Sequence, residues 1–219
     1  MKRCVIVGGA GIERYDLVRN ALREDDFFVF CDSGLKHLEE LRGGPSEEIQ
    51  VTLDLIVGDF DSHENPQMDV ETIVLPCEKD DTDTFFAAKE MVRRGFEAFL
   101  LVGVIGARLD HTLANLSILL MLDDAGREAK AIDDYSEMEI VSAKAGRPGI
   151  AYIEDSYSFF SLLNITGTAE GIAIRNAKFP LEDAKIDCNY QYAVSNEVLP
   201  GKTAEVSISN GRLLLIKDY

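Results

Sequence analysis

The feature that most constrains the fold is a change of pattern near residue 136. Before it, short apolar runs alternate with stretches of helical periodicity; after it, only strand-like runs remain, separated by Gly, Pro, Asn and Asp. Alternating strands and helices are typical of a parallel sheet covered by helices, whereas strands separated by turn residues are typical of an antiparallel sandwich. The sequence therefore predicts an α/β doubly wound, Rossmann-like parallel-sheet domain over residues 1–132 and a small all-β sandwich domain over residues 137–219.

The individual elements follow from the same patterns. In the first half, apolar runs predict strands buried on both faces at residues 3–7, 27–31, 53–57, 72–75 and 99–104. Helices are expected between most of them, at residues 15–24, 34–41, 82–94 and 111–124. In the second half, strands are expected at residues 139–143, 159–163, 169–174, 204–209 and 212–216. Asn210-Gly211 tolerates positive φ and predicts a type I′ hairpin, and residues 133–136 are the expected linker.

Charge and composition exclude several classes of protein. The chain carries 22 Lys and Arg against 39 Asp and Glu, a formal net charge of −17, so nucleic acid and anionic membrane surfaces are not expected partners. The longest apolar run, residues 98–107, is too short to span a bilayer. Four isolated cysteines argue against a zinc site or a disulfide framework and favour a reducing compartment. We therefore expect a cytoplasmic protein.

Two aspartates follow the third predicted strand, in the sequence Gly58-Asp59-Phe60-Asp61-Ser62. In open α/β sheets, ligands bind at the carboxyl ends of the strands. If the chain stays extended, Asp59 and Asp61 point to the same side, where two carboxylates would form a hard oxygen site suited to Mg²⁺. The alternative is a solvated turn, which Asp also favours.

A second acidic cluster, residues 79–83 (KDDTD), lies just before a predicted helix. One acid or Thr82 is enough to cap that helix, so capping does not explain three acids in one turn. Residues 54–83 contain ten acids against one base, Lys79. Crowded carboxylates are costly unless a cation or solvent screens them, and a metal site shared by both clusters would explain their density.

Further polar residues follow other predicted strands. Arg108 is a cation that could neutralise phosphate charge, and Asp110 could cap the next helix. His111 could act as a base, and Asp32 could cap a helix or hold a ligand. Residues 8–11 are glycine-rich but lack the last glycine of the dinucleotide-binding pattern. An acid-rich site without a P-loop fits ATP as its magnesium complex, because the metal bridges phosphate to carboxylate.

The motifs, taken together in their order and spacing, resemble those of the thiamine pyrophosphokinase family. They are residues 31–34 (CDSG), 58–62 (GDFDS), 80–83 (DDTD), 106–115 (GARLDHTLAN), 178–181 (KFPL) and 195–197 (SNE). The resemblance covers nearly the whole chain. It implies an enzyme, with an α/β catalytic domain and a β-sandwich domain, that transfers pyrophosphate from ATP to the hydroxyethyl oxygen of thiamine. It also implies a homodimer, with thiamine held between one subunit's catalytic domain and its partner's sandwich.

The resemblance further implies roles for individual residues. The Mg²⁺ and phosphate-site acids would be Asp59, Asp61 and Asp80. The nucleotide and substrate site would be completed by Asp32, Asp83, Arg108 and Asp110. The thiamine contacts of the sandwich would be Ser195 and Asn196, with Phe179 where some members stack an indole on thiamine. Either Asp83 or Asp110 would orient or deprotonate the hydroxyl group.

Three other hypotheses compete with this one. A pyrophosphokinase of the same fold class could act on another alcohol, such as a hydroxymethylpterin. A thiamine-binding or nucleotide-sensing protein could bind the same ligands without turnover, although a passive binder needs no Mg²⁺ cage. The simplest alternative is an acidic α/β protein whose carboxylates are only solvated.

Overall fold

The computed structural model of the chain describes residues 1–43, 49–60, 68–78 and 80–219. The chain divides into two compact units, Met1–Asp134 and Tyr135–Tyr219. The first contains a parallel sheet with helices and the second contains antiparallel strands, so the predicted fold class is confirmed.

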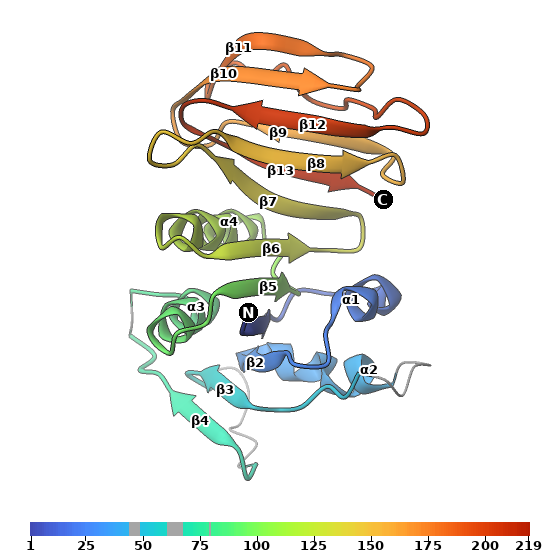
Figure 1. Cartoon of the computed structure of the whole chain (residues 1–219). Helices are drawn as coiled ribbons and strands as arrows, with labels where there is room; N and C mark the ends of the chain where they lie inside the picture. The colour runs from blue at the N-terminus through green and yellow to red at the C-terminus, as the bar shows by residue number, and fades with distance from the viewer. Residues whose placement is uncertain (44–48, 61–67, 79) are drawn as a thin grey trace. The chain divides into compact units, whose positions relative to one another are not determined.

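Within the described part of the first unit, six strands form a parallel sheet. They are β1 (Arg3–Val7), β2 (Phe27–Cys31), β3 (Leu55–Gly58), β4 (Glu71–Val74), β5 (Ala98–Val102) and β6 (Glu128–Ile132). Their order is β4-β3-β2-β1-β5-β6 (Figure 1), and every pair is parallel. The chain builds outward from β1 to β4 and then returns to β5 on the other side of β1. The strand order therefore reverses between β1 and β5, which is where such sheets bind ligands.

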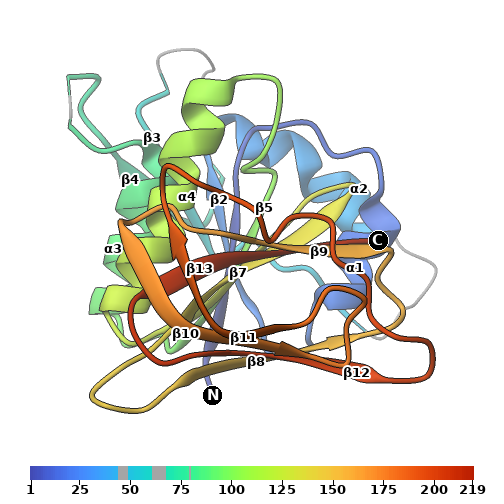
Figure 2. The same cartoon turned by 90° about the horizontal axis from the view of Figure 1, so that it is seen from above.

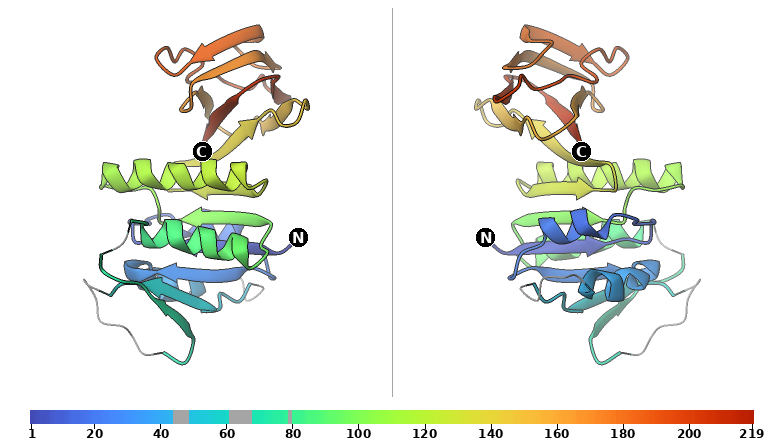
Figure 3. Two further views of the ribbon diagram at one scale, coloured as in Figure 1. Left: turned by 90° about the vertical axis from the view of Figure 1, so that its left-hand side faces the viewer. Right: turned by 90° about the vertical axis from the view of Figure 1, so that its right-hand side faces the viewer.

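Helices cover both faces of this sheet, α1 and α2 on one and α3 and α4 on the other (Figure 3). They are α1 (Tyr15–Ala21), the 3₁₀ helix η1 (Asp32–His37), α2 (Leu38–Arg42), α3 (Asp83–Arg93) and α4 (Leu109–Asp124). Val18 of α1 and Leu41 of α2 pack with Phe28 and Phe30 of β2 in one core cluster. Burial of these side chains, rather than helix propensity, holds such short helices in place.

Three details of the first unit differ from the sequence predictions. The helix expected at residues 34–41 is split into η1 and α2, since the Leu38 N–H donates to the Leu35 carbonyl, three residues back, as in a 3₁₀ helix. The strand β4 is not buried on both faces, since β3 is its one partner among the described strands and Glu71 and Val74 are exposed. The strand β6 was not predicted, because its charged residues interrupt the apolar pattern.

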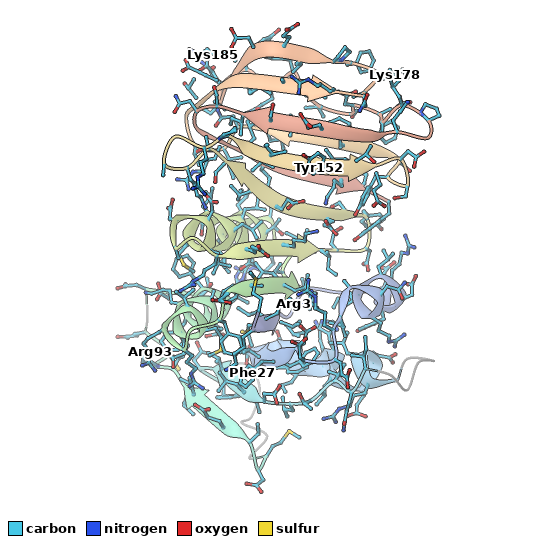
Figure 4. The ribbon with its side chains drawn as sticks, viewed as in Figure 1. Arg3, Phe27, Arg93, Tyr152, Lys178 and Lys185 are labelled. Atoms are coloured by element: carbon cyan, nitrogen blue, oxygen red, sulfur yellow. The ribbon has the colours of Figure 1, made fainter. Side chains whose placement is uncertain are left out.

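A buried ion pair ties β1 to the segment before β2. The Nε and Nη2 atoms of Arg3 (labelled in Figure 4) donate to the two carboxylate oxygens of Asp26, each at 2.6 Å. Arg23 donates its backbone N–H to the same carboxylate at 2.8 Å. Because Arg3 and Asp26 are both buried, each carboxylate oxygen needs such a partner.

The second unit has two antiparallel layers (Figure 2). One contains β7 (Ser136–Ser142), β13 (Arg212–Asp218) and β9 (Phe159–Leu163), in that order. The other contains β11 (Leu181–Asp187), β10 (Thr168–Arg175), β12 (Thr203–Ile208) and β8 (Gly149–Glu154). Inward-facing side chains such as Phe160, Ile172 and Val206 form its core. The strand β11 was not predicted, because its charged residues interrupt the apolar pattern. The strand β8 was missed although its sequence, GIAYIE, is mostly apolar and alternates between the core and the surface.

The predicted hairpin at Asn210-Gly211 is wrong. The strand β12 pairs with β8 and β10, whereas β13 pairs with β7 and β9, so residues 209–211 carry the chain between layers. The backbone of Asn210 instead exchanges two hydrogen bonds with Glu170, at 3.0 and 3.1 Å. Only Gly211 has a positive φ, 82°, and a Cβ there would lie 2.4 Å from the Thr168 carbonyl oxygen.

Candidate active site

Two glycines meet where the strand order reverses, at the carboxyl ends of β1 and β5. The N–H of Gly8 donates to the Val102 carbonyl, and that of Ala10 donates to the Gly103 carbonyl, both at 2.8 Å. A Cβ on Gly8 would lie 2.6 Å from the Gly103 oxygen, and one on Gly103 would lie 2.5 Å from the Gly8 oxygen. Both positions therefore need glycine for the backbones to approach this closely.

A cavity of about 710 Å³ opens at this point of the first unit. Its wall comes from the segments that follow β1, β2, β3 and β5, from the turn before α3 and from the start of α4. That volume lies within the usual range for small-molecule sites. The topology of the sheet and the shape of the surface therefore indicate the same ligand-binding place.

Five carboxylates of the described residues line this cavity: Asp32, Asp59, Asp80, Asp81 and Asp83. Four of them were predicted site residues, whereas the predicted Asp61 lies outside the described residues. Asp81 is paired with Lys89 at 2.8 Å. Burial raises the pKa of the Cys31 thiol well above its ordinary value, and the charges of Asp83 and Asp32 raise it further. Cys31 is therefore a neutral thiol in an acidic wall.

The chemistry of the donor set fits a hard cation. The Oδ1 atom of Asp32 is buried and accepts no hydrogen bond from any described residue, so a cation there would satisfy it. Within the same part of the chain, no three His, Cys, Asp or Glu side chains could hold a metal ion by themselves. Mg²⁺ does not need such a cage, because it binds through one or two carboxylates together with substrate phosphates and water.

Arg108 and Asp110 form an exposed pair at the start of α4. The Nη2 atom of Arg108 lies 2.6 Å from Oδ2 of Asp110, and both side chains are exposed. The N-cap residue of α4 is Arg108, without a side-chain cap, so the predicted capping role of Asp110 is wrong. The hydrogen bond from Arg108 lowers the pKa of Asp110. Arg108 and His111 belong to the cavity wall, but Asp110 does not.

The three predicted thiamine contacts lie together within the second unit. Phe179 is 57% exposed and Ser195 is exposed with a φ of 57°, whereas Asn196 is only 3% exposed. The Asn196 Oδ1 atom accepts the N–H of Phe179 at 3.0 Å, and its Nδ2 donates to the Phe179 carbonyl at 2.8 Å. Lys178, labelled in Figure 4, places its Nζ 5.6 Å from the Phe179 ring centroid.

Sequence reasoning missed several residues of the cavity. Residues 8–11 failed the dinucleotide pattern, yet all four line the wall. Their position after a buried strand at the centre of the sheet was the signal that could have found them. Cys77, Thr84 and Asn115 also line the cavity. Cys77 and Thr84 carry no signal beyond their nearness to the acidic turn, whereas Asn115 ends the motif at residues 106–115, to which the resemblance adds no role for Asn115 itself.

Two family models match the sequence. Residues 18–131 match the model described as thiamin pyrophosphokinase, catalytic domain. Residues 150–213 match the model described as thiamin pyrophosphokinase, vitamin B1 binding domain. The first match spans more than half of the chain and includes most of the cavity wall.

Individual relatives agree with the family match. The chain is 24% identical over 169 residues to thiamine pyrophosphokinase of Bacillus subtilis (strain 168), covering 74% of this chain and 76% of that protein. The crystal structure of thiamine pyrophosphokinase from Bacillus subtilis is similar with a TM-score of 0.82 at 19% identity, over 99% of both chains. That of a thiamin pyrophosphokinase family protein from Enterococcus faecalis has a TM-score of 0.75 at 25% identity, over 100% of this chain and 99% of that one.

The doubly wound sheet, the acid-lined cavity at its switch point and the appended β-domain define an ATP-using kinase with a separate substrate-binding domain. Within that class, the chain belongs to the thiamine pyrophosphokinase family and is an enzyme. No helix among the described residues is long and apolar enough to cross a membrane.

Proposed function

We propose that the chain transfers a pyrophosphoryl group from ATP to the hydroxyethyl oxygen of thiamine. The thiamine oxygen forms a bond to the β-phosphorus, the bond from that phosphorus to the bridging oxygen on the α-phosphorus breaks, and AMP leaves. The hydroxyl proton passes to a base. The observation that carries the proposal is the glycine-bordered cavity of about 710 Å³, in whose wall the described residues place five carboxylates. Phosphoryl-type transfer needs mainly positioning and charge stabilisation, which such a site supplies.

We assign the magnesium-binding role to Asp59, Asp61 and Asp80. These carboxylates alone would repel the triphosphate. When bound, Mg²⁺ would neutralise that charge and hold the triphosphate to the protein. Asp59 and Asp80 belong to the cavity wall. Asp32, whose buried Oδ1 accepts no hydrogen bond from a described residue, adds negative charge to the same wall and would orient the complex of Mg²⁺ with ATP.

Arg108 would bind phosphate directly. In the structure its guanidinium is paired with Asp110, and both side chains are exposed, so exchanging that carboxylate for a phosphate costs little. Of the two candidates for the base, Asp83 fits better. It lines the cavity, whereas Asp110 is outside the wall and its lowered pKa makes it a weaker base.

Thiamine would be held by the second unit. The exposed ring of Phe179 offers stacking and cation–π attraction to the thiazolium, with Ser195 beside Asn196 as a polar contact. We further propose a homodimer with active sites at the subunit interface. Exposed apolar side chains in one segment of the second unit support a surface that a second copy would cover: Tyr190, Tyr192, Val194 and Leu199.

The test is Asp59→Ala against Asp25→Ala, a change that removes the same charge from an exposed position outside the cavity wall. Formation of AMP and thiamine diphosphate is followed by chromatography. Asp59→Ala should reduce turnover by about 100-fold or more with unchanged circular dichroism, and Asp25→Ala should behave as wild type. Near-normal turnover of Asp59→Ala would contradict the magnesium-binding role assigned to Asp59.

A further inference from the structure

Asn115 joins two walls of the cavity. It lies on α4, is 8% exposed, and lines the cavity. Its Nδ2 donates to the Val104 carbonyl at 2.7 Å, and its Oδ1 accepts from the Thr84 hydroxyl at 2.8 Å. A backbone carbonyl can only accept, so the nitrogen must face Val104 and the oxygen must face Thr84.

The chain of hydrogen bonds continues into the acidic turn. The Oγ1 atoms of Thr82 and Thr84 lie 3.2 Å apart. Because the Thr84 proton goes to Asn115, Thr84 accepts from Thr82. The Thr82 oxygen in turn accepts the N–H of Phe85 at 3.3 Å and caps α3. In each hydrogen bond of this series, the donor and the acceptor can therefore be assigned without conflict with the next bond.

The two ends of this series lie in segments whose charged side chains have opposite sign. Thr82 and Thr84 flank Asp83 and follow Asp80, whereas Val104 begins the loop that leads to Arg108. The loop has a second local tie, since the Thr112 hydroxyl accepts the Gly106 N–H at 3.1 Å. Among the hydrogen bonds of the described residues, the two made by the Asn115 amide link the acidic turn and the loop directly.

We propose that Asn115 and Thr84 form a positioning bridge that fixes the separation between the acidic turn and the Arg108 loop. The bridge takes no part in bond making. It holds the carboxylates on one side of the triphosphate and the guanidinium on the other at the spacing that transfer needs. This inference rests on the proposed function for its kinetic consequence, but its structural consequence can be measured without turnover.

The decisive variants are Thr84→Val, which keeps the shape and removes the hydroxyl, and Thr84→Ser, which keeps the hydroxyl. Thr84→Val should lower kcat by about 10- to 100-fold and change KM for ATP by less than about threefold, because misplacement by about 1 Å has that effect. Thr84→Ser should recover most of the lost kcat. An increase confined to KM, or an equal loss in Thr84→Ser, would overturn the bridge.

Asn115→Asp provides a second variant, because it keeps an acceptor for Thr84 but places a carboxylate oxygen against the Val104 carbonyl. It should lower kcat as Thr84→Val does. Hydrogen exchange supplies the readout that needs no activity: amides of residues 103–108 should exchange at least about tenfold faster in Thr84→Val and Asn115→Asp than in wild type. Unchanged exchange in both variants would refute the bridge, whatever the substrate of the chain. Faster exchange in the variants, found together with a wild-type chain that forms no thiamine diphosphate, would refute the proposed function and leave the bridge standing.

Discussion

The side-chain amide of Asn196 holds the main chain of Phe179 from both sides. Its oxygen accepts the Phe179 N–H, its nitrogen donates to the Phe179 carbonyl, and the same oxygen accepts the N–H of Glu197 at 2.9 Å. The backbone of Asn196 also exchanges two hydrogen bonds with Phe160, at 2.8 and 2.9 Å. The Asn196 side chain is 3% exposed and braces Phe179. We therefore propose that it serves thiamine binding indirectly, through Phe179, and not by the direct contact that the resemblance implies.

Replacing this brace should affect thiamine binding through Phe179. Asn196→Ala leaves the N–H and carbonyl of residue 179 without their partner, so the free energy of unfolding should fall by about 1–3 kcal/mol. KM for thiamine should rise while KM for ATP stays within twofold. Urea unfolding and steady-state kinetics measure both. A stability loss with unchanged KM for thiamine would contradict the role of the brace.

The ring at position 179 should set the affinity for thiamine. Cation–π attraction at exposed sites contributes about 0.5–1 kcal/mol and is strongest for Trp, so Phe179→Trp should lower KM for thiamine by about two- to fivefold. Phe179→Leu should raise it, with little effect on KM for ATP. Lys178→Met is the control for the neighbouring lysine. If Phe179→Leu binds thiamine as wild type does, the ring is not part of the site.

Gly9 should be replaceable only together with Ser33. Gly9 has no positive φ, so alanine suits its backbone, but the new Cβ would lie 1.9 Å from Oγ of Ser33 and 3.1 Å from its Cβ. Gly9→Ala should therefore lower the free energy of unfolding by about 1–3 kcal/mol and weaken ATP binding. The double variant Gly9→Ala with Ser33→Gly removes both contacts and should recover most of the loss. Without such recovery, the contact with Ser33 is not the cause.

Acid should weaken the glycine segment through His37. The Nε2 atom of this buried histidine donates to the Ala10 carbonyl at 2.7 Å, and Nδ1 accepts from the Tyr15 hydroxyl at 2.6 Å. Burial, opposed in part by the hydrogen bond to Ala10, lowers the pKa of His37 below its ordinary value of 6.5. Because the unfolded chain then binds the proton more tightly, stability is complete above about pH 6.5 and falls as pH drops through the lowered pKa.

Urea unfolding between pH 5 and 8 measures this dependence. His37→Gln should flatten the fall below pH 6.5 that wild type shows, whereas His111→Gln, at an exposed position, should leave it unchanged. A wild-type slope that persists in His37→Gln would assign the acid sensitivity to other groups.

The strands β1, β2 and β9 could be predicted from the sequence to the residue. Each is a mostly apolar run, and a polar residue or a glycine on either side marks its ends. The hairpin at Asn210-Gly211 was wrong because a local turn signal does not reveal which strands pair, and Asn210 pairs with Glu170. The charged strands β6 and β11 are stabilised by their neighbours, which no local pattern records.

In the candidate site, too, some residues could be predicted from local sequence and others could not. Asp59 and Asp80 could be placed from the sequence, because parallel strands bring their carboxyl ends to one edge of the sheet. The close approach of Gly9 to Ser33 and the bridge from Asn115 to Thr84 could not be predicted, since each joins segments far apart in the chain. The buried role of Asn196 also required tertiary structure, because family resemblance marks a residue without saying what it touches.

The most direct test is to incubate the purified chain with ATP, Mg²⁺ and thiamine and to separate the products by chromatography. We expect AMP and thiamine diphosphate in equal amounts, and neither product after EDTA removes the metal. AMP without thiamine diphosphate would contradict thiamine as the acceptor and favour another alcohol. Thiamine binding with no product would contradict pyrophosphoryl transfer altogether.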